Sequence, residues 1–203
     1  MAANRDVEKL TIAIDVQHAG RLTAIKKKHR RAMSEYVADL IEQGTPPDEA
    51  RLTARRLRAE RWPALDQIVA QAVERRLAEE DLAGPWEPLT EEEAERATLS
   101  GRRPGKNYPG FLKYRAYEFP SDLVMRLRTA AVRVSEGPLA QLEELGLTYN
   151  RLDFEPEERE KREELIELVF SVPRIVRQAL ERFGPWPAEE RPPSAPPVED
   201  SAD

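Results

Sequence analysis

The stretch QIVAQAVER, residues 67–75, returns as RIVRQALER at residues 174–182, and this recurrence decides how the rest of the chain divides. Upstream of the two copies, LTIAIDVQHAGRL (residues 10–22) corresponds to RAYEFPSDLVMRL (residues 115–127). In both stretches a strand-like alternation of side chains is followed by an Arg-Leu pair. Downstream, the tripeptide GPW follows each copy. Three matches in the same order at similar spacing predict an internal duplication.

The duplication divides the chain into four parts. The first unit spans residues 1–83, with extra helices at its C-terminal end, and the second, related unit spans residues 113–187. Residues 84–112 between them are rich in Gly, Pro and charged side chains, which is typical of a linker. Residues 188–203 are rich in Pro, Ser and acids, and we expect this tail to be unfolded because it has little to bury.

Composition limits the classes of protein to which the chain can belong. The sequence is 40% hydrophobic and 34% charged, has a formal net charge of -6 and contains no cysteine. The absence of cysteine excludes disulfides, thiolate metal sites and cysteine nucleophiles. The N-terminus lacks the apolar core of a signal peptide, and no run approaches the roughly 18 apolar residues of a membrane span. We therefore expect a cytoplasmic protein without a membrane partner.

Each unit is predicted to open with a short strand. Apolar residues alternate with small or polar ones from Leu10 to Ile14, which indicates a strand with one buried face. Tyr117 and Phe119 hold that face in the second unit. Pro120 ends the second strand because it has no N–H for the ladder, and Ser121 can cap the helix that follows.

Helices are predicted to complete each unit. An amphipathic helix follows the strand, and a second helix opens at Ser34, its predicted N-cap, and stops at Gly44. The stretch SEGPLAQLEELG, residues 135–146, is its counterpart in the second unit. The duplicated phrase forms the closing amphipathic helix. We expect its buried face to consist of Ile68, Val69 and Ala72 in one copy and Ile175, Val176 and Ala179 in the other.

A short strand, an amphipathic helix and a second helix opening with SEYVADLIE resemble the ribbon-helix-helix (CopG/Arc-like) family of DNA-binding proteins. The resemblance covers residues 9–43 and, more loosely, residues 114–146. It implies a mostly helical fold in which two strands pair antiparallel as a ribbon that enters the DNA major groove. A lone strand cannot satisfy its backbone groups. The two strands therefore pair either within one chain, giving tandem units that form a pseudo-dimer, or between two chains.

The resemblance also implies which residues contact DNA. The helix start at Ser34 grips a phosphate, and the basic run before it supplies further phosphate contacts; a solvated helix end is the alternative role for that run. The run contributes Lys26, Lys27, Lys28, Arg30 and Arg31. The groove-facing residues are Thr11 and Ala13 in the first strand and Tyr114 and Ala116 in the second. Asp15 and Glu118 share that face, where they repel phosphate.

Other charged and aromatic segments have simpler interpretations. Arg51, Arg55 and Arg58 share one helical face, which we interpret as a charged surface rather than a track along DNA. The loop Arg102–Lys106 is interpreted as a flexible connector, with an arm that reaches DNA as the alternative. A helix is expected at residues 91–99 because Thr90 can cap it. The tryptophans are expected to pack against helix ends.

These features predict a DNA-binding protein, either a transcriptional regulator or a plasmid- or phage-maintenance factor, with double-stranded DNA as its partner. The alternative is a non-enzymatic protein-interaction or scaffolding module that retains the fold without binding DNA. Such a module would bind a protein partner or form a homo-oligomer. Asp15, Glu118 and the net charge favour this alternative. No motif supports an enzyme or a cofactor, and His18 and His29 lack the neighbouring ligands that a metal site needs.

Overall fold

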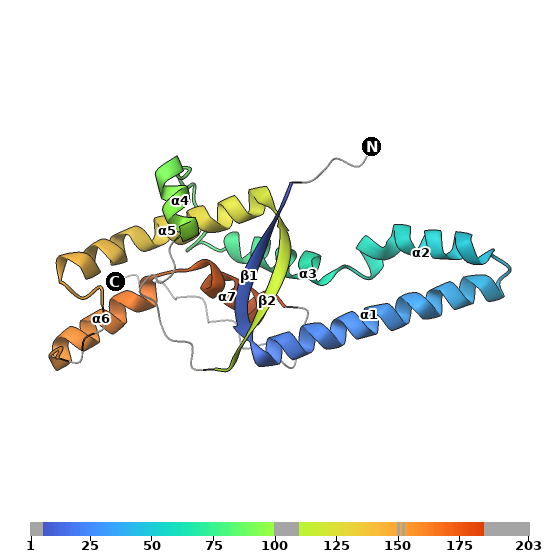
Figure 1. The fold of residues 1–203 in the computed structure, drawn as a ribbon, viewed down its shortest axis with the longest axis horizontal. Coiled ribbons are helices and arrows are strands. Elements are labelled where there is room, and N and C mark those ends of the chain that lie inside the picture. Colours follow the sequence, from blue (N-terminus) through green and yellow to red (C-terminus); the bar gives the residue numbers. More distant parts are fainter. Residues whose placement is uncertain (1–5, 100–109, 150, 152, 185–203) are drawn as a thin grey trace, which may run out of the picture.

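The computed structural model describes residues 6–99, 110–149, 151 and 153–184. Helices account for most of these residues, and two strands form a small antiparallel sheet, so the predicted mixture of helices and short strands is confirmed. A strand, a long helix and two shorter helices follow one another twice (Figure 1). The first series is β1 (Val7–Asp15), α1 (Val16–Glu42), α2 (Pro47–Arg61) and α3 (Leu65–Leu77). After α4 (Glu91–Leu99), the second series is β2 (Leu112–Pro120), α5 (Ser121–Glu144), α6 (Pro156–Leu168) and α7 (Val172–Phe183).

The two strands pair with each other within one chain. Their register places Leu10 opposite Tyr117 and Thr11 opposite Ala116. Burial alternates along both strands, as the sequence predicted: one face of this ribbon is covered and the other is open to solvent. The most deeply buried side chains of the covered face are Ile12, Ile14, Tyr117 and Phe119.

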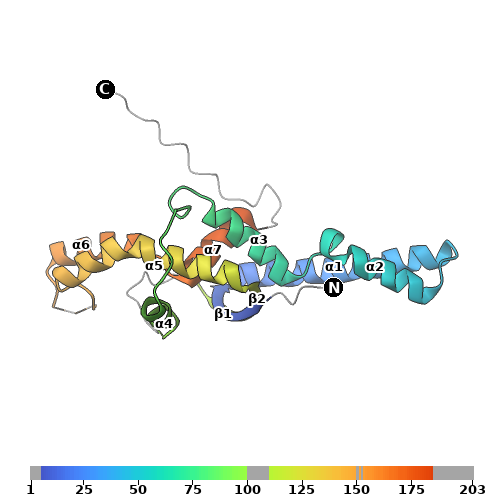
Figure 2. The same ribbon diagram turned by 90° about the horizontal axis from the view of Figure 1, so that it is seen from above.

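The covered face of the ribbon lies over α3 and α7, which form the opposite layer of the molecule (Figure 2). These two helices carry the duplicated phrase and pack against each other. The predicted burial of their apolar residues is confirmed at Ile68, Val69, Ala72, Ile175, Val176 and Ala179. Arg76 also joins the two helices, since its guanidinium donates to Gln178 Oε1 at 3.0 Å and to Asp81 Oδ2 at 2.6 Å. The phrase is therefore a packing element.

Two helical arms extend from this centre in opposite directions, one formed by α1 and α2 and the other by α5 and α6 (Figure 1). In the first arm the aromatic rings of Tyr36 and Trp62 lie 5.4 Å apart, centroid to centroid, which fixes the end of α2 against α1. The second arm has its own small apolar cluster, which includes Leu142, Phe154 and Ile166.

The arms are built in the same way in both series. Gly44 and Gly146 follow the two long helices with φ of 91° and 67°, a backbone region that glycine adopts readily and other residues rarely do. The predicted stop at Gly44 is thus confirmed. Proline stands at the first position of both α2 and α6, where its missing N–H costs no helical hydrogen bond.

The predicted break inside each long helix is wrong, because α1 and α5 are continuous. Ser34 does not cap a second helix; its hydroxyl donates to the carbonyl of Arg30 at 3.0 Å, one turn back in α1. The Lys, Arg, Ala and Met residues before it favour helix, and no Gly or Pro interrupts them. Residues 135–144 of the counterpart stretch also lie within α5, although Pro138 stands inside that helix.

The start of each long helix also differs from the expectation. Asp15 caps α1, since its carboxylate accepts a hydrogen bond from the backbone N–H of Gln17 at 2.6 Å. Ser121 was predicted to cap the second helix, but it is the first residue of α5 and Pro120 occupies the N-cap position.

The predicted helix in the linker is confirmed as α4. The backbone N–H of Glu93 donates to Thr90 Oγ1 at 3.3 Å, and the backbone N–H of Thr90 donates to Glu93 Oε2 at 2.8 Å. This reciprocal pair is a capping box. Arg133 of α5 donates to both carboxylate oxygens of Glu93, each at 2.9 Å, and so holds α4 against α5. The basic loop Arg102–Lys106 lies outside the described residues.

Candidate nucleic-acid interface

The exposed face of the ribbon carries the four residues predicted to face the groove. Thr11, Tyr114 and Ala116 are exposed, with Tyr114 at 74% of its full accessible surface, and Ala13 is half-buried. The register places Thr11 opposite Ala116 and Ala13 opposite Tyr114, so these residues form two adjacent cross-strand pairs. The strand alternation therefore brings the four predicted residues together on one surface.

Lys9 extends this surface and was missed because the predicted strand began at Leu10, three residues too late. β1 begins at Val7, so Lys9 is exposed on the open face and lies opposite Glu118. Asp15, in contrast, uses its carboxylate to cap α1. Two acids were expected to repel phosphate. The negative charge of Glu118 lies across the ribbon from the positive charge of Lys9, and the carboxylate of Asp15 caps the start of α1.

The basic run of α1 is divided between two sides of the helix. Lys26, His29, Arg30 and Met33 follow helical spacing and line a pocket together. Lys27, Lys28 and Arg31 are exposed and absent from that lining, and Arg31 Nε donates to Glu35 Oε1 at 2.7 Å. Ser34 is exposed on the middle of α1, so it has no helix-start N–H groups beside it with which to grip a phosphate.

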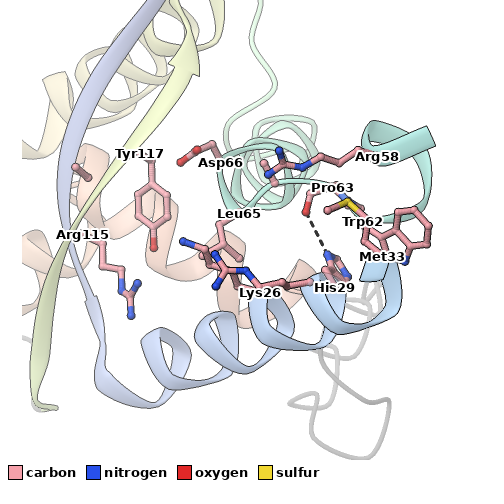
Figure 3. A pocket seen from close by; sticks show the side chains of 13 residues that line it. Lys26, His29, Met33, Arg58, Trp62, Pro63, Leu65, Asp66, Arg115 and Tyr117 are labelled. Carbon is pink, nitrogen blue, oxygen red and sulfur yellow. Dashed lines mark hydrogen bonds between the residues drawn. The ribbon is translucent and has the colours of Figure 1, made fainter. Parts of the chain in front are cut away.

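The pocket measures about 470 Å³ and lies between α1, the end of α2, the α2–α3 connection and β2 (Figure 3). Four cations line it: Lys26 and Arg30 from α1, Arg58 from α2 and Arg115 from β2. Asp66 is the carboxylate among its lining residues. The balance of charge around the pocket is therefore positive.

The cations of the pocket are held to different degrees. Arg115 is half-buried and donates to Thr23 Oγ1 at 2.7 Å and to the carbonyl of Ala19 at 3.3 Å, so its guanidinium is fixed beside α1. Among the residues that the structure describes, Lys26, Arg30 and Arg58 form no ion pair. These three side chains are free to meet an anion.

Sequence reasoning missed Arg58, Arg115 and Tyr117 as parts of one site. Arg58 was assigned to a charged surface, whereas it faces α1 across the pocket. Arg115 had a visible signal: it occupies the strand position that corresponds to Leu10, so a charged side chain interrupts an apolar stripe. The convergence of these residues depends on the bend between α2 and α3, where His29 Nδ1 lies 3.2 Å from the carbonyl oxygen of Pro63.

Trp62, which follows α2, packs as expected, since its ring contacts Tyr36. Trp86 is 38% exposed, and its Nε1 donates to the carbonyl of Leu82 at 2.9 Å. Trp186 lies outside the described residues. Within the described ranges, no group of three or more His, Cys, Asp and Glu side chains is placed to hold a metal ion. No helix in those ranges combines the length and apolar character needed to cross a bilayer.

Comparisons with protein-family models, curated proteins and solved structures find no significant match to this chain. The functional assignment therefore depends on the geometry and chemistry of the ribbon and the pocket.

Proposed function

We propose that this protein binds double-stranded DNA by placing the β1–β2 ribbon in the major groove. The observation that carries this proposal is the ribbon itself: one face is buried and the other is open to solvent, on the side of the molecule opposite α3 and α7 (Figure 2). The major groove is about 12 Å wide and admits a two-stranded ribbon. Lys9, Thr11 and Tyr114 supply polar atoms toward the bases and phosphates.

Both strands of the ribbon come from one chain, which supports a pseudo-dimer of two ribbon-helix-helix-like units. Each unit departs from the family pattern because its first long helix continues through the expected turn. Phosphate contacts therefore come from side chains rather than from a second helix start. Lys26, Arg30 and Arg58, which have no ion-pair partners among the described residues, are the candidates for that contact.

A cytoplasmic regulator of transcription, or a plasmid- or phage-maintenance factor, is the role that we propose for such a protein. The net charge of -6 does not oppose this role, because binding depends on the local charge at the interface. Residues 188–203 carry five acids and one arginine, so much of the negative charge lies in the C-terminal tail.

Fluorescence anisotropy with a labelled random duplex at about 50 mM salt tests this proposal. We expect binding that weakens as salt rises, with a slope of about -0.9 per phosphate neutralised. Thr11→Glu places a negative charge at the middle of the open face and is expected to weaken binding at least about tenfold. Gln71→Glu adds the same charge on the exposed side of α3 and is the matched control.

Two results would contradict the proposal: no binding of duplex DNA at low salt, or equal losses for Thr11→Glu and Gln71→Glu. Equal losses would mean that the net charge of the protein, rather than the ribbon face, governs the interaction.

A second candidate function is a protein-interaction or scaffolding module. It is favoured by an apolar patch at one end of the ribbon, where Val16, Phe111, Leu112 and Tyr114 are exposed, Phe111 to 86%. Association through this patch would persist at high salt and would be lost in a Phe111→Ser, Tyr114→Ser double variant. Light scattering that gives a monomer, together with pull-downs that capture no partner, would count against this function.

A further inference from the structure

We propose that the pocket between α1, α2, α3 and β2 is a binding site for a phosphate group carried by an organic molecule. This inference builds on the proposed function, which uses Lys26, Arg30 and Arg58 for phosphate contact, and adds a discrete concave site to which Arg115 and Tyr117 also contribute. The site can take its phosphate from a small organic phosphate or from a nucleic-acid backbone. Both sources share the chemistry that the pocket recognises.

The first observation is the buried hydroxyl of Tyr117. Tyr117 is 2% exposed, and its hydroxyl has no hydrogen-bond partner among the described residues. Buried polar side-chain atoms in native proteins nearly always have a partner, so an unpaired one calls for an explanation. The hydroxyl points from β2 into the pocket, toward α1 (Figure 3). A ligand in the pocket would provide the missing acceptor.

The second observation is that Arg115, which lines the same pocket, also carries an unpaired donor. Its terminal nitrogen binds Thr23 and Ala19, but its Nε is buried and has no hydrogen-bond acceptor among the described residues. The guanidinium is held by α1 and so retains its orientation when the pocket is empty. Arg115 and Tyr117, two positions apart in β2, each carry one unpaired buried donor, and both side chains extend toward α1 (Figure 3).

The third observation is the charge around these donors. Lys26, Arg30 and Arg58 line the pocket and have no ion-pair partner in the described part of the chain. Asp66 opposes them with one carboxylate, whose Oδ1 accepts from the backbone N–H of Glu118 at 3.3 Å. Lysine and arginine side chains only donate hydrogen bonds, so a ligand with several acceptor oxygens and a negative charge fits them. A phosphate group has both properties.

The protonation of Tyr117 is consistent with this role. Burial raises the pKa of its hydroxyl to about 12, and the neighbouring Arg115 works in the opposite direction. The hydroxyl therefore carries its proton at neutral pH and can donate it to a phosphate oxygen.

The size of the pocket indicates that the phosphate carries an organic group. About 470 Å³ is in the range of small-molecule sites and exceeds what a phosphate ion needs. Arg115 and Tyr117 lie on the β2 side of the pocket, whereas Met33, Trp62 and Pro63 line the far side (Figure 3). The phosphate would lie against the donors of β2 and α1, with the organic part toward Met33 and Trp62.

Isothermal titration of the full chain with inorganic phosphate and with thymidine 5′-monophosphate tests the site. Tyr117→Phe removes only the hydroxyl, and we expect it to weaken binding of the monophosphate about fivefold. The same change is expected to raise the melting temperature of the free protein, because it removes a buried polar atom that has no partner. A hydroxyl with a purely structural role would give a lower melting temperature instead.

Charge variants provide the matched comparison. Lys26→Gln, on the pocket side of α1, is expected to weaken binding of the monophosphate about tenfold. Lys27→Gln makes the same charge change at an exposed position outside the pocket lining and is expected to change affinity less than about twofold. Equal losses for the two variants would overturn the proposal.

A parallel titration with duplex DNA distinguishes the two sources of phosphate. Loss of monophosphate binding in Lys26→Gln with unchanged DNA affinity identifies a small organic phosphate as the ligand. Loss of DNA affinity in Lys26→Gln but not in Lys27→Gln identifies a backbone phosphate. If the wild type and Lys26→Gln have the same affinity for inorganic phosphate, for the monophosphate and for DNA, the pocket is not a phosphate site. Monophosphate binding without DNA binding would contradict the proposed function but would support the proposed phosphate site in the pocket.

Discussion

Thr11 and Ala116 lie opposite each other at the middle of the β1–β2 ribbon. They are 105 residues apart (116 − 11 = 105), and so are Asp15 and Pro120 (120 − 15 = 105), which precede the first helix of each series. Thr11 and Ala116 are therefore equivalent positions of the two series that pair with each other, and the other strand pairs are arranged around them. A pseudo-two-fold axis through the ribbon would produce this relationship, which supports the proposal that one chain supplies both halves of a ribbon-helix-helix-like assembly.

Intrachain pairing has a consequence for unfolding. Because the ribbon needs no second molecule, folding is unimolecular, and the melting temperature should not depend on protein concentration. Calorimetry over a hundredfold range of concentration checks this expectation. A melting temperature that rises with concentration would instead indicate strands exchanged between chains.

The continuity of α1 predicts opposite signs for two substitutions. Ser34→Ala should leave stability unchanged or raise it by up to about 0.5 kcal/mol, because alanine is the better residue inside a helix. Asp15→Ala should lower stability by about 1 kcal/mol, because it removes the side chain that caps α1. Urea unfolding of both variants measures the difference. If Ser34→Ala lowered the free energy of unfolding by about 1 kcal/mol, Ser34 would be acting as the N-cap that the sequence predicted, and the continuity of α1 would be contradicted.

The attachment of α4 to α5 should be sensitive to acid. Hydrogen bonds from Arg133, and then from the backbone of Thr90, lower the pKa of Glu93 from 4.5 to about 2. A carboxyl whose pKa is lower in the folded state stabilises that state above its unfolded pKa and stops doing so as pH falls through its folded pKa. The attachment should therefore weaken progressively between about pH 4.5 and pH 2.

The amide resonance of Ala94 in NMR spectra can follow this transition. At pH 6 we expect Glu93→Ala to give the Ala94 chemical shift that the wild type reaches only at low pH, when α4 is no longer held against α5. Glu91→Ala, at an exposed position of the same helix, should behave as the wild type does. Identical pH profiles for the wild type and Glu93→Ala would contradict the role of the Arg133–Glu93 contact.

Local patterns predicted much of the fold. Alternation identified the covered and open faces of both strands, the Thr90 capping box located α4, and the duplicated phrase identified two helices that meet in the core. Each of these features depends on side chains close in sequence, so the relevant physical signal is contained in a short stretch.

The failures arose where local preference and tertiary packing both mattered. Ser34 resembles an N-cap in isolation, but the residues before it also favour helix, and packing of α2 along α1 stabilises the continuous form. Asp15 was read as a ribbon residue because the strand pattern extends to it, and its capping role appears only once the helix start is fixed.

The pocket could not be predicted as a site because its residues come from separate elements. Lys26, Arg58 and Arg115 are distant in sequence and converge through the bend after α2. The shared face of the ribbon could be predicted, because strand alternation alone places Thr11, Ala13, Tyr114 and Ala116 on it. Their contact with DNA remains a prediction.

The chain contains no cysteine, so a single introduced cysteine can carry a photo-crosslinker at a chosen place. Thr11→Cys places the crosslinker at the middle of the open ribbon face, and Gln71→Cys places it on α3, in the opposite layer (Figure 2). With duplex DNA at low salt, we expect efficient crosslinking from position 11 and little from position 71. Equal crosslinking from the two positions, or crosslinking from position 71 alone, would contradict the assignment of the ribbon as the DNA-contacting surface.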